Sequence, residues 1–368
     1  METWHRKEQA LPLNGGDTSG LQALIDEVCG DNNERIKQSL ALLSMYTADE
    51  ILAKVNAYIN NLTYDRKPQS LYEPIKYVLE LGGKRIRPTL MLLSYNLFKD
   101  DPETILSPAC ALETYHNYTL LHDDLMDDAP LRRGQQTVHV RWDANTAILS
   151  GDSMLVLAFE RMARCGDKHL HEVLSLFAET ALEIGEGQQY DMEFEHRNDV
   201  REEEYIEMIR LKTSVLLACA MKIGAILADA PKEDADKLYK FGEQIGLAFQ
   251  LQDDYLDVYG DPKVFGKKIG GDITSNKKTY MLINAFNKAD AKQRKELERW
   301  VACENFNRDE KVAAVTALYN KIGVDKLAQD KINHYFEVAS KYLNDVSLPE
   351  ERKAEMKAYA VRLLNRQR

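Results

Sequence analysis

The stretch HNYTLLHDDLMDDAPLRRG, residues His116–Gly134, joins an apolar helical run to a dense group of carboxylates. Asp123 and Asp127 are four positions apart, so on a helix they lie on one face, with Asp124 beside them. Carboxylates this close repel one another, and the apolar residues before them indicate a buried setting, so a cation is needed to neutralise the group. The pattern therefore predicts Mg²⁺ bound through carboxylates together with phosphate oxygens of a substrate.

The same arrangement recurs in Asp253-Asp254-Tyr255-Leu256-Asp257, again after an apolar helical run, Ile245–Phe249. A single motif of this kind occurs by chance in many acidic proteins, whereas two at the ends of apolar helices are a much stronger signal. We expect Asp253 and Asp257 to face the first motif across a helical bundle. Metal ions held between the motifs would draw a diphosphate away as a leaving group.

Apolar residues recur at helical spacing through most of the chain after Thr47. Thr47-Ala48-Asp49-Glu50 has the capping-box pattern, and Gly82-Gly83 supplies a C-terminal cap for a helix over Leu71–Leu81. No β-hairpin pattern or alternating strand run is evident. The sequence predicts an all-α protein, a single large helical bundle, with further helices over Thr89–Phe98, Ala109–Leu125, Thr146–Arg164, His171–Glu195, Glu203–Asp229, Ala235–Val258 and Tyr280–Asn287.

The first 44 residues differ from the rest because Leu11–Gly20 is rich in glycine and polar residues. We expect residues 1–44 to be a poorly defined leader with one short helix from about Ser19. Residues 45–368 are expected to form the helical catalytic domain.

Composition excludes several classes of protein. A net charge of -11 without long basic runs argues against a nucleic-acid binder. No stretch of about 18 apolar residues appears, so we expect no membrane span. The five cysteines lie far apart with no CxxC pair, which favours free thiols in a reducing compartment, and we expect a cytoplasmic protein.

Basic residues stand beside the acidic motifs. Arg132-Arg133-Gly134 follows the first motif, and guanidinium groups suit phosphate oxygens geometrically. Gly82–Pro88, GGKRIRP, supplies a basic turn between two helices, and Lys212-Thr213 places an ammonium inside an apolar helix. Lys267 and Lys277 follow the second motif. Each is more often a surface charge when taken singly, but together they indicate cationic donors for a diphosphate.

These motifs together resemble the all-trans isoprenyl diphosphate synthases, the farnesyl and geranylgeranyl diphosphate synthases. The resemblance rests, in family order, on GGKRIRP, HNYTLLHDDLMDDAPLRRG, GQQYDM, KTS, FQLQDDYLDVYGDP and GKKIGGDI, which span nearly all of Leu71–Tyr280. It implies a helical bundle of isoprenoid synthase type around a deep central cavity. It also implies head-to-tail condensation of isopentenyl diphosphate with dimethylallyl, geranyl or farnesyl diphosphate, a homodimer, and three Mg²⁺ ions with diphosphate bound.

The resemblance also implies individual roles. The metal ligands would be Asp123, Asp127 and Asp253, assisted by Asp124 and Asp257. The allylic diphosphate would be bound by Arg132, Lys212 and Lys267, and isopentenyl diphosphate by Lys84, Arg87, His116 and Arg133. Thr213 and Gln250 would stabilise the carbocation, Lys277 would help to close the loop over the allylic group, and Gln188 and Asp191 would support the site. In the family the released diphosphate takes the proton, so no nucleophilic side chain is needed.

Product length is expected to depend on the helix that carries the first motif. Tyr118 and Thr119 lie about one turn before Asp123 and would face the growing tail. In the family, an aromatic residue five positions before the first aspartate closes the cavity of short-chain enzymes, and Tyr118→Ala should lengthen the product. The sequence leaves a C15 or a C20 product open.

Three other interpretations compete with this one. A class I terpene cyclase also uses an aspartate-rich motif and magnesium, but such enzymes usually have a different second motif and need no isopentenyl diphosphate site. A non-catalytic regulatory subunit would be expected to lack some of the aspartates, and none is missing here. A helical scaffold with acidic patches would leave the basic motifs unexplained.

Overall fold

The computed structural model describes residues 45–261 and 269–365. The chain divides into two units, residues 1–46 and 47–368, and every element below belongs to the second. The expected leader, with its short helix from about Ser19, and the predicted site residue Lys267 lie outside the described residues.

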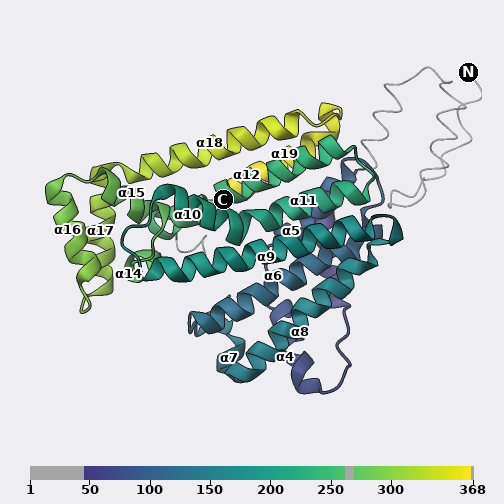
Figure 1. Ribbon diagram of the computed structural model, residues 1–368, viewed down its shortest axis with the longest axis horizontal. Coiled ribbons are helices and arrows are strands. Elements are labelled where there is room, and N and C mark those ends of the chain that lie inside the picture. The colour runs from purple at the N-terminus through teal and green to yellow at the C-terminus, as the bar shows by residue number, and fades with distance from the viewer. Residues whose placement is uncertain (1–44, 262–268, 366–368) are drawn as a thin grey trace, which may run out of the picture. The chain divides into compact units, whose positions relative to one another are not determined.

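Most of the described structure is helical, which confirms the all-α prediction (Figure 1). The longer helices are α3 (Ala48–Asn60), α4 (Gln69–Glu80), α5 (Ile86–Asn96), α6 (Leu106–Met126), α8 (Ala144–Met162), α9 (Leu170–Glu195), α10 (Glu202–Ile209), α11 (Val215–Leu227), α12 (Lys232–Tyr259), α15 (Tyr280–Lys288), α16 (Ala291–Ala302), α17 (Arg308–Ile322), α18 (Val324–Asn344) and α19 (Glu350–Leu364). The short ones are α7 (Val138–Arg141) and α14 (Gly271–Thr274), with 3₁₀ turns at Pro102–Ile105, Ala163–Cys165 and Asp167–His169.

Helix α11 lies at the centre because it is apolar on nearly every face. Of its 13 residues, 12 are buried, and it packs against α5, α9 and α12. Gly224 sets the distance to α5, since a Cβ there would lie 2.3 Å from the carbonyl oxygen of Met91. This core holds α6 and α12, which carry the two aspartate motifs, in fixed positions.

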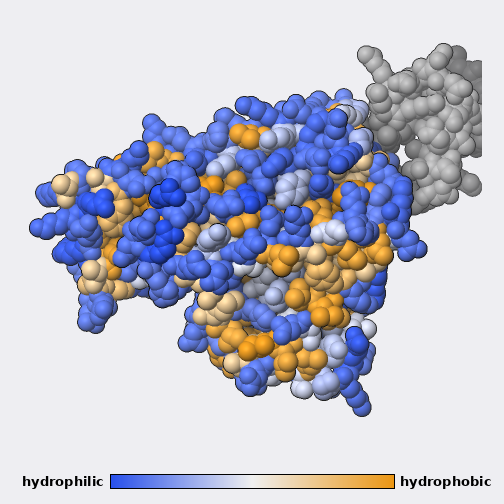
Figure 2. All heavy atoms as spheres, viewed as in Figure 1, coloured by the Kyte–Doolittle hydropathy of each residue, from blue (hydrophilic) through white to orange (hydrophobic). Residues whose placement is uncertain are grey.

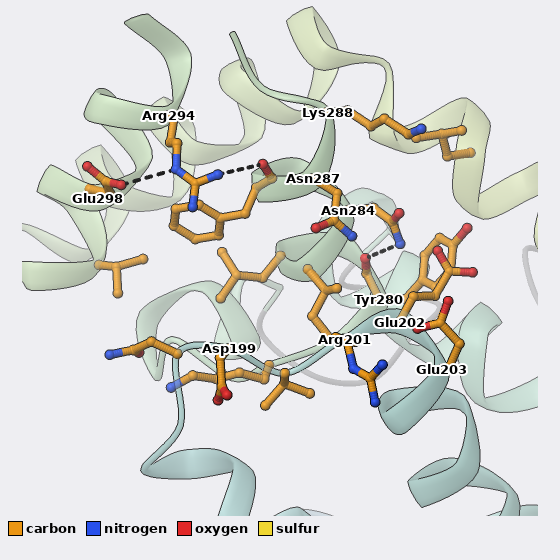
Figure 3. Close-up of a pocket in the computed structure, with 18 of the residues that line it drawn as sticks. Asp199, Arg201, Glu202, Glu203, Tyr280, Asn284, Asn287, Lys288, Arg294 and Glu298 are labelled. Carbon is orange, nitrogen blue, oxygen red and sulfur yellow. Dashed lines mark hydrogen bonds and ion pairs between the residues drawn. The ribbon is translucent and has the colours of Figure 1, made fainter. Parts of the chain in front are cut away.

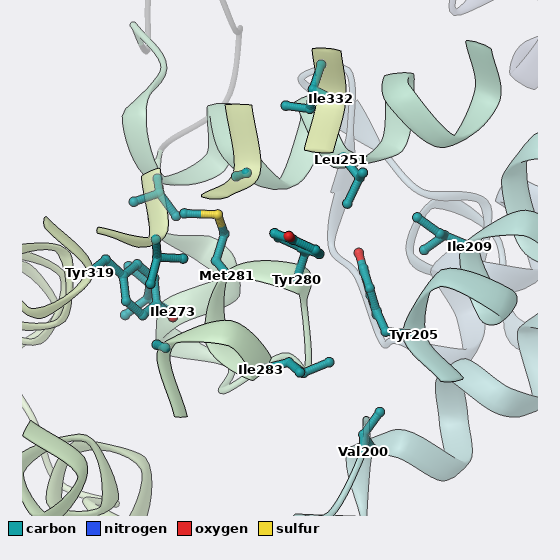
Figure 4. Close-up of a cluster of buried hydrophobic side chains, with 14 of the residues drawn as sticks. Val200, Tyr205, Ile209, Leu251, Ile273, Tyr280, Met281, Ile283, Tyr319 and Ile332 are labelled. Carbon is teal, nitrogen blue, oxygen red and sulfur yellow. The ribbon is translucent and has the colours of Figure 1, made fainter. Parts of the chain in front are cut away.

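A second apolar cluster supports the second motif. Side chains from α10, α12, α14, α15, α17 and α18 meet around Tyr205 and Tyr280 (Figure 4). Tyr205, Leu251 and Met281 are almost completely buried there. The cluster packs against the C-terminal part of α12, which carries Asp253 and Asp257.

The structure corrects two expectations. A two-residue hairpin forms after the first motif, where β1 (Leu131–Arg132) pairs with β2 (Gln135–Gln136). Arg133 and Gly134 make its turn with φ of 53° and 76°, the positive values that such turns require. The helix expected over Glu203–Asp229 is interrupted by a π-helical segment at Arg210–Ser214.

Helix α11, although apolar on most faces, has only 13 residues. In the part of the chain that the structure describes, no helix combines the length and apolar character needed to cross a bilayer.

Candidate active site

A cavity of about 720 Å³ lies between α6, α9 and α12 and takes in residues from both aspartate motifs. Asp123 and Asp253 both line it, which agrees with the expectation that the motifs face each other. Of the other residues predicted for the site, the cavity is lined by Lys84, Arg87, His116, Tyr118, Thr119, Arg133, Gln188, Lys212, Thr213 and Gln250.

The basic turn at Gly82–Pro88 meets the hairpin at the cavity rim. Arg133 donates a hydrogen bond to the carbonyl oxygen of Gly82, and a Cβ at Gly83 would lie 2.7 Å from its Nη2. The glycine pair therefore leaves room for the guanidinium. The two basic motifs, 51 positions apart in the chain, form one cationic rim.

Burial at this rim lowers the pKa of two groups predicted to bind isopentenyl diphosphate. Burial lowers the pKa of Arg87 to about 10, and its Nε finds no hydrogen-bond partner among the residues that the structure describes. Burial, followed by the charges of Arg87 and Arg133, holds the pKa of His116 well below its usual value. His116 is therefore neutral at pH 7, and the arginines supply the positive charge.

Arg85 stabilises the basic turn through buried contacts. It makes a buried ion pair with Glu113 of α6 at 2.8 Å and donates to the carbonyl oxygen of Leu79 at 2.6 Å. Sequence analysis missed Glu113, although an acidic residue within an apolar helical run signals a buried partner. The pair fixes the turn that carries Lys84 and Arg87.

The π-helical segment places Lys212 and Thr213 in the cavity wall. Such insertions re-aim side chains and occur often at functional sites. Gly187 of α9 allows the segment to approach, since a Cβ there would lie 2.4 Å from the backbone nitrogen of Lys212. The Lys212 ammonium donates to Asp191 at 2.7 Å and to Asp123 at 3.3 Å. The predicted lone ammonium is thus paired with carboxylates at the site.

Lys277 also lies near the Asp191 carboxylate, with its Nζ 3.8 Å from Oδ2. Burial alone would raise the pKa of Asp191, but Lys277 and Lys212 outweigh it and keep that pKa low. The turn before Lys277 is held by Lys311 of α17, which donates to Asn276 at 2.8 Å. Lys311 is 1% exposed, and sequence analysis did not identify it.

The first motif is divided between two environments. Asp124 is buried and accepts two hydrogen bonds of 2.7 Å from Arg132, so these residues, predicted to bind metal and diphosphate, bind each other. Neither lines the cavity, and nor do Asp127 and Asp257. Asp127 caps the end of α6, and burial together with the charge of Asp123 raises its pKa. That repulsion is what a bound cation would relieve.

Asp254 and Asp257 of the second motif accept hydrogen bonds from other parts of the protein. Asp254 is buried and accepts hydrogen bonds from Tyr205 and, at 3.2 Å, from Gln250. Burial and the charge of Asp272 raise the pKa of Asp254 to about 8. Asp257 accepts a hydrogen bond of 2.9 Å from the Asp272 backbone. Among residues 45–261 and 269–365, no three acidic, histidine or cysteine side chains form a ready-made metal site.

The far end of the cavity is apolar and aromatic. Tyr118 is half-buried there, and its ring lies 5.4 Å from the ring of Tyr115, which in turn contacts Phe177. Thr119 also lines the cavity, and its hydroxyl donates to the carbonyl oxygen of His116 in its own helix at 2.8 Å. Thr213 also donates to Gln250 at 3.1 Å, so the two residues expected near a carbocation adjoin each other.

A larger hollow of about 1050 Å³ lies outside this site, between the start of α10 and helices α15 and α16 (Figure 3). It contains none of the residues predicted for the site. Arg294, on its lining, donates to Glu298 of the same helix at 3.3 Å and to the carbonyl oxygen of Phe286 at 3.4 Å. The chemistry predicted from the sequence belongs to the smaller cavity.

Comparison with known proteins agrees with this geometry. The family model for polyprenyl synthetase matches residues 68–320, which contain both aspartate motifs. The chain is 43% identical to a short chain isoprenyl diphosphate synthase of Methanocaldococcus jannaschii, over 73% of this chain and 81% of the relative. It is 40% identical to a geranylgeranyl diphosphate synthase of Methanosarcina mazei, over 67% and 78% of the two chains. A crystal structure of a geranylgeranyl pyrophosphate synthase superimposes with a TM-score of 0.84 at 41% identity, covering 88% of this chain and all of the other. This chain is therefore a member of the polyprenyl synthetase family.

Proposed function

We propose that the protein condenses isopentenyl diphosphate head-to-tail with an allylic diphosphate, releases diphosphate, and makes a short product, farnesyl or geranylgeranyl diphosphate. The observation that supports this most directly is the shared cavity, which is lined both by Asp123 and Asp253 and by the cationic rim residues Lys84, Arg87 and Arg133. One diphosphate site beside the carboxylates and another at the rim suit a reaction between two diphosphates.

The carboxylates suit Mg²⁺, because their ligand atoms are all oxygen and because Asp127 is already crowded by Asp123. Asp123, Asp127, Asp253 and Asp257 would hold the ions. Bound Mg²⁺ would supply charge that stabilises the leaving diphosphate. Lys212 would add its ammonium on the same side, since it already bridges two carboxylates there.

The rim would bind the second substrate without ionising it. Arg87 and Arg133 would pair with the isopentenyl diphosphate oxygens, and neutral His116 would offer a single N–H donor. The double bond would then face the allylic carbon near Thr213 and Gln250, whose side-chain oxygens can stabilise positive charge. The aromatic end beyond Tyr118 would take the growing hydrocarbon tail.

The direct experiment is incubation with isopentenyl diphosphate, Mg²⁺ and dimethylallyl, geranyl or farnesyl diphosphate, followed by chromatography of the products. We expect linear prenyl diphosphates, and no turnover with EDTA or in Asp123→Ala. A cyclised hydrocarbon from one allylic substrate would instead identify a terpene cyclase. Binding of the substrates without turnover would indicate a regulatory subunit.

We further propose a homodimer formed through α8 and α9. Val156 and Leu182 are 68% and 71% exposed, and apolar residues gather over the region of α4, α7 and α8 (Figure 2). Exposed apolar area of this kind marks an interface. Sedimentation should give a dimer for the parent and a monomer for Val156→Asp. Free, buried Cys110 and Cys219 suit the reducing cytoplasm.

A further inference from the structure

The imidazole of His122 connects the tail cavity to a neighbouring helix. It lines the cavity, and its ring stands edge to face with the Tyr118 ring at 4.9 Å and an interplanar angle of 68°. On the other side its Nε2 lies 3.3 Å from the carbonyl oxygen of Ile148 in α8. One side chain thus links the aromatic end of the cavity to the backbone of α8.

The imidazole fits because residue 151 is glycine. A Cβ at Gly151 would lie 2.2 Å from Nε2 of His122 and 2.6 Å from its Cδ2, far closer than any such contact allows. Glycine is otherwise unfavourable inside a helix, and Gly151 lies within α8, buried and with an ordinary helical φ. The ring occupies the space that a side chain would fill, so we call this contact the Gly151 notch.

We propose that His122 and the Gly151 notch form a second determinant of product length, because they hold the Tyr118 ring across the tail cavity. This inference rests on the proposed condensation. The other ring partner of Tyr118 among the described residues is Tyr115, one turn away on the same helix. Without the imidazole, the Tyr118 ring is free to turn toward α8, and the cavity deepens along α6. Gly151, on α8, therefore helps to set the length of the prenyl product.

The test compares the parent with His122→Ala, Gly151→Ala and the double variant, using dimethylallyl diphosphate and excess isopentenyl diphosphate. Dephosphorylated products are separated by chromatography. His122→Ala should lengthen the main product by one five-carbon unit. Gly151→Ala should change the product length in the parent, because the new methyl displaces the imidazole. It should have no further effect in the His122→Ala background, where the methyl meets no ring.

His122→Phe is the matched control, since it keeps a ring beside Tyr118 and should keep the length of the parent product. The inference is overturned if His122→Ala retains the parent product pattern, or if Gly151→Ala acts equally with and without His122. His122 adjoins Asp123, so a second measurement covers any variant that turns over too slowly for product analysis. The thermal shifts caused by farnesyl and geranylgeranyl diphosphate are compared. His122→Ala, alone or together with Gly151→Ala, should favour the longer ligand more than the parent does, whereas His122→Phe should not. If the parent makes no prenyl diphosphate, the proposed condensation is refuted. The ligand preference measured by thermal shift still tests whether the Gly151 notch limits the length of the bound tail.

Discussion

Replacing Glu113 by Gln should lower the free energy of unfolding by about 3 kcal/mol. The Arg85 and Glu113 side chains are 3% and 2% exposed, with Nη1 and Oε1 2.8 Å apart. Removing one partner of a buried ion pair costs about 3–5 kcal/mol, because the remaining charge stays buried without a counterion. We expect the lower end, since the Gln amide oxygen still accepts a hydrogen bond and the Leu79 carbonyl still accepts one from Arg85.

Urea unfolding followed by circular dichroism measures this loss. Glu80→Gln is the control, because the Lys76–Glu80 pair has a separation of 3.7 Å and side chains more than half exposed, so it should change stability by less than about 1 kcal/mol. Arg85→Met combined with Glu113→Gln should be more stable than the sum of the single changes predicts. A loss below about 1 kcal/mol in Glu113→Gln, or strict additivity, would refute the reasoning.

Three further changes probe the site. Gly187→Ala should lower kcat at least tenfold with little loss of helix, since the new methyl group would collide with the Lys212 backbone. Steady-state kinetics measure kcat and circular dichroism measures the helix content, and an unchanged kcat would contradict the prediction. Lys311→Met should raise KM for the allylic diphosphate several-fold and cost about 1–3 kcal/mol in urea unfolding, because Asn276 loses its donor; an unchanged KM would disconnect α17 from the site. The pKa of His116 is lower in the folded state than in the unfolded state, so the unfolded state binds an extra proton as the pH falls. The contribution of neutral His116 to stability is therefore present above the ordinary histidine pKa of 6.5 and is lost as the pH falls below that value. His116→Asn should flatten this part of a plot of the unfolding midpoint against pH, and an unchanged slope would assign the loss to other groups.

Features that depend on neighbouring residues could be predicted from the sequence. The capping box at Thr47 forms as expected, with Glu50 as its reciprocal partner. Helix α4 ends at Glu80, directly before Leu81 and the glycine pair. Asp123 and Asp253 face one cavity because helical periodicity fixes which side of each helix the motif occupies.

Features that depend on contacts between residues far apart in the chain could not be predicted from the sequence. The π-helical segment requires room beside it, and that room comes from Gly187 and from Gly246, where a Cβ would lie 2.5 Å from Ser214. Nothing within Arg210–Ser214 itself signals the insertion. Lys311 was missed for the same reason, since its partner Asn276 lies 35 positions away in a turn with no regular pattern.

The hardest property to predict is which partner each charge takes. From the sequence, Asp124 and Arg132 were expected to be two independent ligands, whereas in the structure they form an ion pair with each other. Asp123 and Asp127 are then the first-motif carboxylates that are not paired with Arg132. Arg85 and Arg87 are two positions apart, yet one is neutralised by Glu113 and the other keeps a lowered pKa at the cavity wall. A motif of several like residues therefore contains both the groups that bind and the groups that hold them in place, and only their neighbours in space distinguish the two.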